Sequence, residues 1–326
     1  MRLQSDDGTR RLRDDEAGIE EAAAILRAGG TVAFPTETVY GLGADATNGE
    51  AVARIYAAKG RPRFNPLIAH LPDAEAAFAQ GRFDEAAQKL AAAFWPGPLT
   101  LVVPLSEKAP ISDLARAGLP SIGLRVPHHP AAEALLRTVA RPVVAPSANR
   151  SGHVSPTTAD HVLADLDGRI DAVLDGGSTR VGVESTIVAC LDGAPRLLRA
   201  GGVPREALEA ALGRPLAEAG EAVIAPGMLA SHYAPAARLR LDADAIEPGE
   251  AALLLGAHAP AGLDRARVAI NLSPRGDLGE AAARLFAALR DLDAAGVDTV
   301  AVAPIPRHGL GEAIRDRLLR AAAPRG

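Results

Sequence analysis

The sequence predicts an α/β fold, in which a twisted mixed sheet with flanking helices is followed by a smaller β/α domain. The chain has 326 residues, enough for two domains, and 48% of them are apolar, enough for a substantial core. Strand-like and helix-like stretches alternate through the first 215 residues. Many of the strand-like runs are continuously apolar, which is typical of a sheet covered on both faces.

The elements of the first 215 residues follow from the spacing of apolar side chains. Helical spacing predicts helices at residues 18–28, 50–58, 84–94, 130–139, 157–166 and 204–212. Short apolar runs predict strands at residues 31–34, 67–71, 99–104, 121–126, 142–145, 172–174, 185–190 and 196–199. We therefore expect a first domain over residues 1–215.

The pattern changes after this point. Residues 216–237 resemble a linker, although His232 and Tyr233 are unusual in a passive one. A regular pattern then predicts strands and helices in a second domain over residues 238–326. The strands are expected at 252–255, 268–272 and 299–302, and the helices at 279–292 and 310–322.

Composition excludes several classes of protein. The net charge is −5, and residues 1–240 and 241–326 are both slightly acidic, which argues against a large nucleic-acid-binding face. Cys190 is the one cysteine, so an internal disulfide and a cysteine-based zinc site are excluded. The charged first residues contain no apolar signal core, and no apolar run is long enough to span a membrane. We expect a cytoplasmic protein.

A hydroxyl-rich loop follows the first predicted strand. The apolar run ends at Pro35, and Thr36, Thr38 and Tyr40 then offer hydroxyl groups. The glycines at the end of the loop match the start of a G-x-G-x-x-[G/A] pattern. A dinucleotide-binding loop is disfavoured because the pattern lies six residues beyond the strand. We expect the two glycines to form a tight turn instead.

A cationic segment follows the second predicted helix. Lys59, Arg61 and Arg63 carry the charge. Pro62 and Pro66 stiffen the backbone, and Asn65 adds an amide. A solvated helix end, where cations complement the helix dipole, is the alternative interpretation. With the hydroxyl-rich loop, the segment favours a small anionic ligand.

Two charged or polar residues interrupt apolar strands. Arg125 is either an arginine whose head reaches the surface or a clamp for a carboxylate or phosphate. His70, within an apolar run, is either a satisfied core histidine or a ligand-facing one.

Residues 143–158 form a corner that leads from a strand into a helix. Ser155 or Thr157 could simply cap that helix. Capping leaves Ser147, Asn149 and Ser151 unexplained, and such small polar groups beside a helix start favour anions.

Known catalytic motifs are missing from the sequence. There is no P-loop, no G-x-S-x-G elbow, and no evident nucleophile–base pair, metal-ligand spacing or carboxylate dyad. Hydroxyls, arginines and amides suit positioning and charge neutralisation, the main demands of nucleotidyl or phosphoryl transfer. The residues alone thus predict an α/β enzyme that acts on a small, phosphorylated anion.

Five segments together resemble the YrdC-domain family, namely residues 35–42, 59–62, 96–100, 145–149 and 184–186. Residues 231–235 and the second domain are similar to the two-domain form of the threonylcarbamoyl-AMP synthases in that family. The resemblance implies a YrdC-like twisted mixed sheet and a Rossmann-like second domain. A hydrogenase-maturation relative of the fold would carry zinc-finger cysteines, which this chain lacks.

The resemblance implies a nucleotidyltransferase, an L-threonylcarbamoyladenylate synthase. L-Threonine, bicarbonate and ATP would give threonylcarbamoyl-AMP and pyrophosphate, with Mg²⁺ accompanying ATP and held by no protein side chain. The product would serve N6-threonylcarbamoyladenosine synthesis beside the tRNA anticodon, through downstream tRNA threonylcarbamoyl-transfer proteins. We do not expect direct tRNA binding or membrane association. An RNA-binding module of the YrdC fold without nucleotidyltransferase activity is the alternative.

The resemblance also implies site residues. Lys59 and Arg61 would neutralise charge during catalysis, and Tyr233 would make the linker a lid over the nucleotide. The residues expected around L-threonine are Thr38, His70, Arg125, the backbone at Ala145, and Ser185. Those expected around ATP are Arg61, Asn65, Ser121, Ser147, Ser155, Arg199 and Tyr233.

Overall fold

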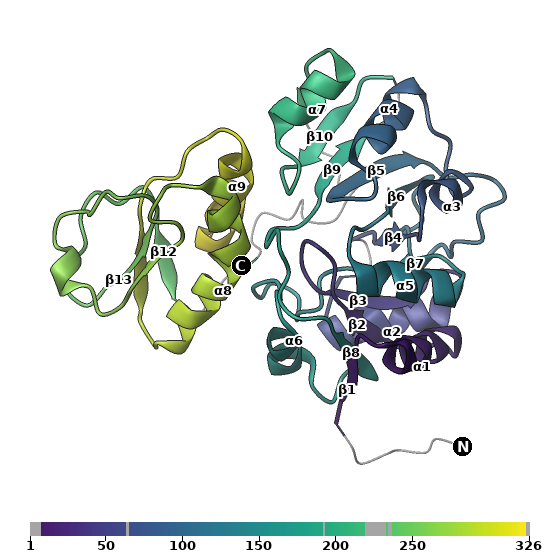
Figure 1. The fold of residues 1–326 in the computed structure, drawn as a ribbon, viewed down its shortest axis with the longest axis horizontal. Coiled ribbons are helices and arrows are strands. Elements are labelled where there is room, and N and C mark those ends of the chain that lie inside the picture. The colour runs from purple at the N-terminus through teal and green to yellow at the C-terminus, as the bar shows by residue number, and fades with distance from the viewer. Residues whose placement is uncertain (1–7, 63–64, 192, 219–232, 234–236, 324–326) are drawn as a thin grey trace.

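The computed structural model describes residues 8–62, 65–191, 193–218, 233 and 237–323. Within these residues the chain forms a large mixed sheet with flanking helices and a small sheet with two long helices (Figure 1). The predicted fold class is confirmed.

The large sheet contains eleven strands among the described residues, in the order β1-β8-β2-β3-β7-β4-β6-β5-β9-β10-β11. Parallel and antiparallel pairs occur side by side, as between β4 and β6 and between β5 and β6. The strands are β1 (Arg10–Arg13), β2 (Val32–Phe34), β3 (Gly41–Asp45), β4 (Ile68–His70), β5 (Leu99–Pro104), β6 (Ser121–Arg125), β7 (Val143–Val144), β8 (Ala172–Asp175), β9 (Thr186–Ala189), β10 (Arg196–Arg199) and β11 (Ala217–Glu218).

Helices with clear capping signals cover this sheet. The Asn48 side chain accepts from the backbone N–H groups of Glu50 and Ala51 and begins α2. Gly60, with a φ of 60°, ends α2 in the left-handed conformation that glycine favours. The helices are α1 (Glu16–Arg27), α2 (Gly49–Lys59), α3 (Ala74–Phe78), α4 (Glu85–Phe94), α5 (Pro130–Val139), α6 (Ala159–Leu166) and α7 (Arg205–Leu212).

The small domain is a parallel four-stranded sheet covered by helices. Its strands β12 (Arg238–Arg240), β13 (Ala251–Leu254), β14 (Ala269–Asn271) and β15 (Thr299–Val302) run in the order β12-β15-β13-β14. Helices α8 (Leu278–Ala294) and α9 (Leu310–Ala322) lie on the side that faces the large domain (Figure 1). Apolar side chains from both helices, such as Phe286 and Ile314, are buried in the core of this domain.

The two glycines after the hydroxyl-rich loop correct one prediction. They belong to β3, which pairs antiparallel with β2, and not to a tight turn. A Cβ at Gly43 would come within 2.9 Å of the Phe34 ring, and one at Gly41 within 3.0 Å of the Ala145 Cβ. Glycine is therefore required by close packing in a strand rather than by turn geometry.

Some elements were not predicted, among them β1, β3, α3, β11 and β12. In β11, Ala217 and Glu218 pair with β10, so the start of the predicted linker adds to the large sheet. Residues 219–232 and 234–236 lie outside the described part of the chain, and the linker therefore stays a prediction. Among the helices that the structure describes, none has the length and apolar character needed to cross a membrane.

Candidate active site

A buried cavity lies over the central strands of the large sheet. Ile68 and His70, two residues apart on β4, face the same side, and His70 pairs in register with Arg125 of β6. An isolated antiparallel β-bridge between Gly41 and Ser147 brings together the start of β3 and the segment after β7. The cavity is lined by Thr36, Val39, Gly41, Arg61, Ile68, His70, Arg125, Ala145, Pro146, Ser147, Glu184, Ser185, Arg199 and Tyr233.

Arg125 is held by a polar relay at one end of the cavity. Its Nη2 donates to Thr38 Oγ1 at 2.8 Å and lies 2.9 Å from a Glu37 carboxylate oxygen. Thr38 Oγ1 lies 2.8 Å from Thr36 Oγ1, which donates in turn to the Val39 carbonyl at 2.7 Å. The guanidinium thus has a fixed orientation, and its charge is balanced by a carboxylate.

Glu37 is a site residue that sequence reasoning missed. It is buried beside Arg125, although it stands within the same motif as Thr36 and Thr38. The signal was available, because an arginine inside an apolar strand needs a partner when it is buried.

His70 is a neutral member of the site. Burial, reinforced by the charge of Arg125, lowers the pKa of His70 to about 3. Its Nδ1 lies 3.1 Å from the Ile68 carbonyl, which can only accept, so this nitrogen carries the proton. The ring also packs edge-on against Phe34, with centroids 6.1 Å apart.

Ser185 also lines the cavity, and its contacts link two strands of the large sheet. Its hydroxyl lies 2.8 Å from Thr100 Oγ1 of β5. The Arg199 guanidinium at the end of β10 donates to the Ser185 carbonyl at 2.9 Å and to its hydroxyl at 3.2 Å.

Arg61 and Arg199 are buried without a carboxylate partner within 4 Å in the part of the chain that the structure describes. Burial lowers the pKa of Arg61 to about 10, and it also lowers the pKa of Arg199. Arg61 Nη2 donates to the Pro66 carbonyl at 3.2 Å, and its Nε makes no hydrogen bond. Such groups create a strong demand for an anion.

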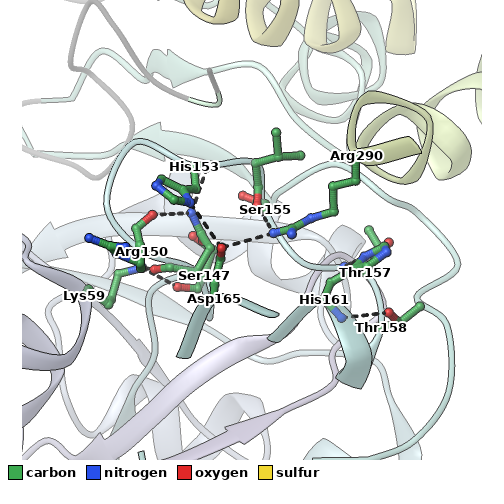
Figure 2. A network of polar contacts seen from close by, with 12 residues as sticks. Lys59, Ser147, Arg150, His153, Ser155, Thr157, Thr158, His161, Asp165 and Arg290 are labelled. Atoms are coloured by element: carbon green, nitrogen blue, oxygen red, sulfur yellow. Dashed lines mark hydrogen bonds and ion pairs between the residues drawn. The ribbon is translucent and has the colours of Figure 1, made fainter. Parts of the chain in front are cut away.

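Lys59 is not one of the residues that line the cavity, and its side chain lies beside Ser147 (Figure 2). Its Nζ donates to the Ser147 carbonyl at 2.6 Å and to the Asn149 carbonyl. Burial, together with the charge of Arg61, holds the pKa of Lys59 well below its ordinary value. The contacts of Lys59 are thus made with the loop that carries Ser147.

The segment that follows this loop contacts the second domain through Arg290 (Figure 2). Asp165 of α6 lies 3.1 Å from His153 Nδ1 and 3.2 Å from Arg290 of α8. Arg290 also donates to the Val154 carbonyl at 2.5 Å. The loop is thus fixed from both domains.

Glu184 connects the cavity with α9. It accepts from Ser155 Oγ at 2.6 Å and from Arg317 Nε at 2.8 Å. Burial alone would raise the pKa of Glu184, but the charges of Arg317 and Arg199 hold it at about 2. Tyr233 lines the cavity nearby, stacked on Phe286 with centroids 5.5 Å apart.

Of the predicted site residues, eight line the cavity: Arg61, His70, Arg125, Ala145, Ser147, Ser185, Arg199 and Tyr233. Thr38 and Ser155 each bond to a lining residue. Asn65 is buried near Arg61, with its side-chain oxygen unpartnered. Ser121 stands apart, at the opposite end of β6 from Arg125 and paired with Pro104.

The fold and the cavity define a two-domain α/β protein with an arginine-lined cavity. A family model described as telomere recombination, for the YrdC-type domain, matches residues 24–201. A second, described as the C-terminal domain of threonylcarbamoyl-AMP synthase, matches residues 203–323. The chain belongs to the threonylcarbamoyl-AMP synthase family, in its two-domain form, so the resemblance is confirmed.

Individual relatives agree with this assignment. The threonylcarbamoyl-AMP synthase of Bacillus subtilis is 43% identical, with 98% of this chain and 97% of that protein covered. That of Pyrococcus abyssi is 41% identical, with 97% of each covered. The crystal structure of P. abyssi Sua5 complexed with L-threonine superposes with a TM-score of 0.86 at 38% identity, covering 96% of this chain and 97% of that one.

Proposed function

We propose that this enzyme is a nucleotidyltransferase that converts L-threonine, bicarbonate and ATP into threonylcarbamoyl-AMP and pyrophosphate. Membership of the synthase family supports the reaction, and the P. abyssi relative crystallised with L-threonine supports the amino-acid substrate. The product would supply N6-threonylcarbamoyladenosine synthesis in tRNA, through proteins that transfer the threonylcarbamoyl group.

The pairing of the buried arginines is the observation that carries this proposal. Arg125 has the carboxylate of Glu37, whereas Arg61 and Arg199 have none within 4 Å among the described residues. A buried guanidinium without a counter-charge is costly, so a ligand that brings several negative charges would be bound strongly there. A triphosphate supplies those charges.

The threonine half of the cavity would be the end that contains Arg125. Its guanidinium can take a carboxylate while the Thr38 hydroxyl and the Glu37 carboxylate hold it in place. His70 stays neutral, so it adds no charge beside the amino group of the substrate. Ser185 and the backbone at Ala145 complete this half.

The reaction would then proceed in two steps. The uncharged threonine amine attacks the carbon of CO2, one C=O π bond opens onto oxygen, and the nitrogen releases a proton to solvent, which gives a carbamate. If bicarbonate reacts directly, a C–O bond breaks instead and water leaves with the proton. A carbamate oxygen attacks the α-phosphorus, the bond to the bridging oxygen breaks, and pyrophosphate leaves. Arg61 and Arg199 would stabilise the charge that develops on the phosphates, and Lys59 would hold the Ser147 loop against them.

We propose that ATP binds together with Mg²⁺, which would supply neutralisation of phosphate charge. Such an ion would be held mainly by phosphate oxygens and water. Glu37 and Glu184, the nearest carboxylates, already pair with Arg125 and Arg317. The described residues contain no cluster of three or more histidine, cysteine or acidic side chains that could hold a metal.

Pyrophosphate release from ATP and bicarbonate, measured with and without L-threonine, tests the proposed function. We expect release that depends on L-threonine, with threonylcarbamoyl-AMP identified by mass spectrometry. Release that is indifferent to L-threonine, or no release at all, would refute the assignment.

A further inference from the structure

The second domain places one arginine against the cavity wall of the first. Arg317 of α9 is fully buried, and its Nε donates to Glu184 at 2.8 Å, a contact between residues 133 positions apart. Its Nη1 donates to the Ala200 carbonyl at 2.9 Å and to its own neighbour Asp316 at 2.7 Å. Figure 1 shows α9 on the side of the small domain that faces the large one.

Arg317 also packs on a residue that lines the cavity. Its guanidinium carbon lies 5.4 Å from the centre of the Tyr233 ring, and the same ring stacks on Phe286 of α8. Tyr233 is therefore held by two side chains of the second domain. Glu184 and Tyr233 both line the cavity, so the contacts of Arg317 converge on one wall.

Glu184 poses an electrostatic problem for a triphosphate site. Its carboxylate lines the same cavity as Arg199, and the charge of Arg199 reaches it. Without another partner, the carboxylate would attract Arg199 and also repel phosphate groups. Because Glu184 is paired with Arg317, Arg199 donates instead to Ser185, the residue that follows Glu184. Arg199 therefore forms no ion pair with Glu184.

We propose that Arg317 is a positioning residue for the ATP half of the site: by pairing with Glu184 it leaves Arg199 available to the nucleotide phosphates. The second domain is thus part of the nucleotide site, and its role is electrostatic as well as structural. This inference rests on the function proposed above.

The threonine half gives the inference an internal reference. Arg125 is balanced by Glu37 and fixed by Thr38, and both of these contacts join residues of the first domain. Loss of Arg317 should therefore weaken the use of ATP and spare the use of L-threonine. A general loss of folding would affect both substrates alike.

The test compares three full-length variants in the pyrophosphate assay. Arg317→Met should raise the KM for ATP at least tenfold and leave the KM for L-threonine within twofold. The double variant Glu184→Gln, Arg317→Met removes the carboxylate that would capture Arg199, so its KM for ATP should return to within about threefold of the wild-type value. Arg205→Met, which removes another contact to α9 through Glu312, is the matched control and should leave both KM values within twofold.

The rescue distinguishes positioning from simple packing. If the double variant is as impaired as Arg317→Met, or if both KM values rise together, the inference is wrong. If Arg317→Met does not fold, Arg317→Lys replaces it. A single ammonium cannot reproduce the fork that joins Glu184 and the Ala200 carbonyl, so the KM for ATP should rise at least threefold and that for L-threonine should not.

Failure of the inference can be separated from failure of the proposed function. Wild-type enzyme without threonine-dependent pyrophosphate release would overturn the function itself. Active wild-type enzyme with an unchanged KM for ATP in Arg317→Met would overturn only the role assigned to Arg317.

Discussion

His70 makes the stability of this protein depend on pH by an amount that the structure allows us to work out. The pKa of His70 is lowered from about 6.5 to about 3 in the folded chain, first by burial and then by the charge of Arg125. As the pH falls below 6.5, the unfolded chain takes up a proton at this position and the folded chain does not. The stabilisation is therefore complete above pH 6.5 and is lost as the pH falls toward 3.

The size of the effect follows from the two pKa values. Between pH 7.5 and pH 5.0, the difference in proton uptake at His70 should lower the free energy of unfolding by about 2 kcal/mol. Urea unfolding at both pH values should show this loss in the wild-type chain. The loss should be smaller by about 2 kcal/mol in His70→Gln, because glutamine does not titrate. The contributions of other titrating groups are common to both proteins and cancel in the comparison.

A control separates the position from the substitution. His258 is an exposed loop residue, and His258→Gln introduces the same chemical change outside the core. If the wild-type chain and His70→Gln lose the same stability between the two pH values, His70 titrates alike in the folded and unfolded states. The reasoning that burial and the charge of Arg125 lower the pKa of His70 would then be wrong.

Two further changes test how the cavity is built. Thr38→Val removes the acceptor of an Arg125 hydrogen bond and interrupts the relay to Thr36, so the KM for L-threonine should rise about tenfold, equivalent to about 1.4 kcal/mol, while the KM for ATP stays unchanged. An equal rise for both substrates would contradict the division of the cavity. Lys59→Met removes two hydrogen bonds to the Ser147 loop, so the Ser151 amide, which donates to the Lys59 carbonyl, should exchange hydrogen at least tenfold faster; unchanged protection would show that Lys59 does not hold the loop.

Much of the fold was predictable because apolar spacing and local geometry agree. Helices at 130–139 and 310–322 and strands at 99–104 and 196–199 have the predicted bounds. The strand β3 was missed because glycine, alanine and aspartate are poor strand formers, and its sequence contains little else. It forms because β2 and β7 pair with it on either side, which is a tertiary effect.

The site shows a similar division. Arg61 could be singled out because it follows a helix end, and Arg125 because it stands inside an apolar strand. Arg199 was named through the family resemblance. Arg317 was missed because its partner Glu184 is distant in sequence, although one signal was present. In α9 it lies on the same helical face as Ile314 and Leu318, where an arginine requires a buried partner.

The carboxylates are distributed unevenly among the buried arginines of the cavity, and no sequence pattern contains that information. Four arginines are buried at or beside the cavity, and the two that have a carboxylate partner, Arg125 and Arg317, are fixed by their pairing. Arg61 and Arg199 bond to backbone carbonyls instead, which satisfies some of their donors but leaves their charge unbalanced. An unbalanced buried charge is destabilising by several kcal/mol, so an anion that paired with these two arginines would relieve that cost and bind more tightly. A highly charged ligand beside Arg61 and Arg199, with a small zwitterion beside Arg125, would match this asymmetry. ATP and L-threonine are such a pair in the proposed reaction.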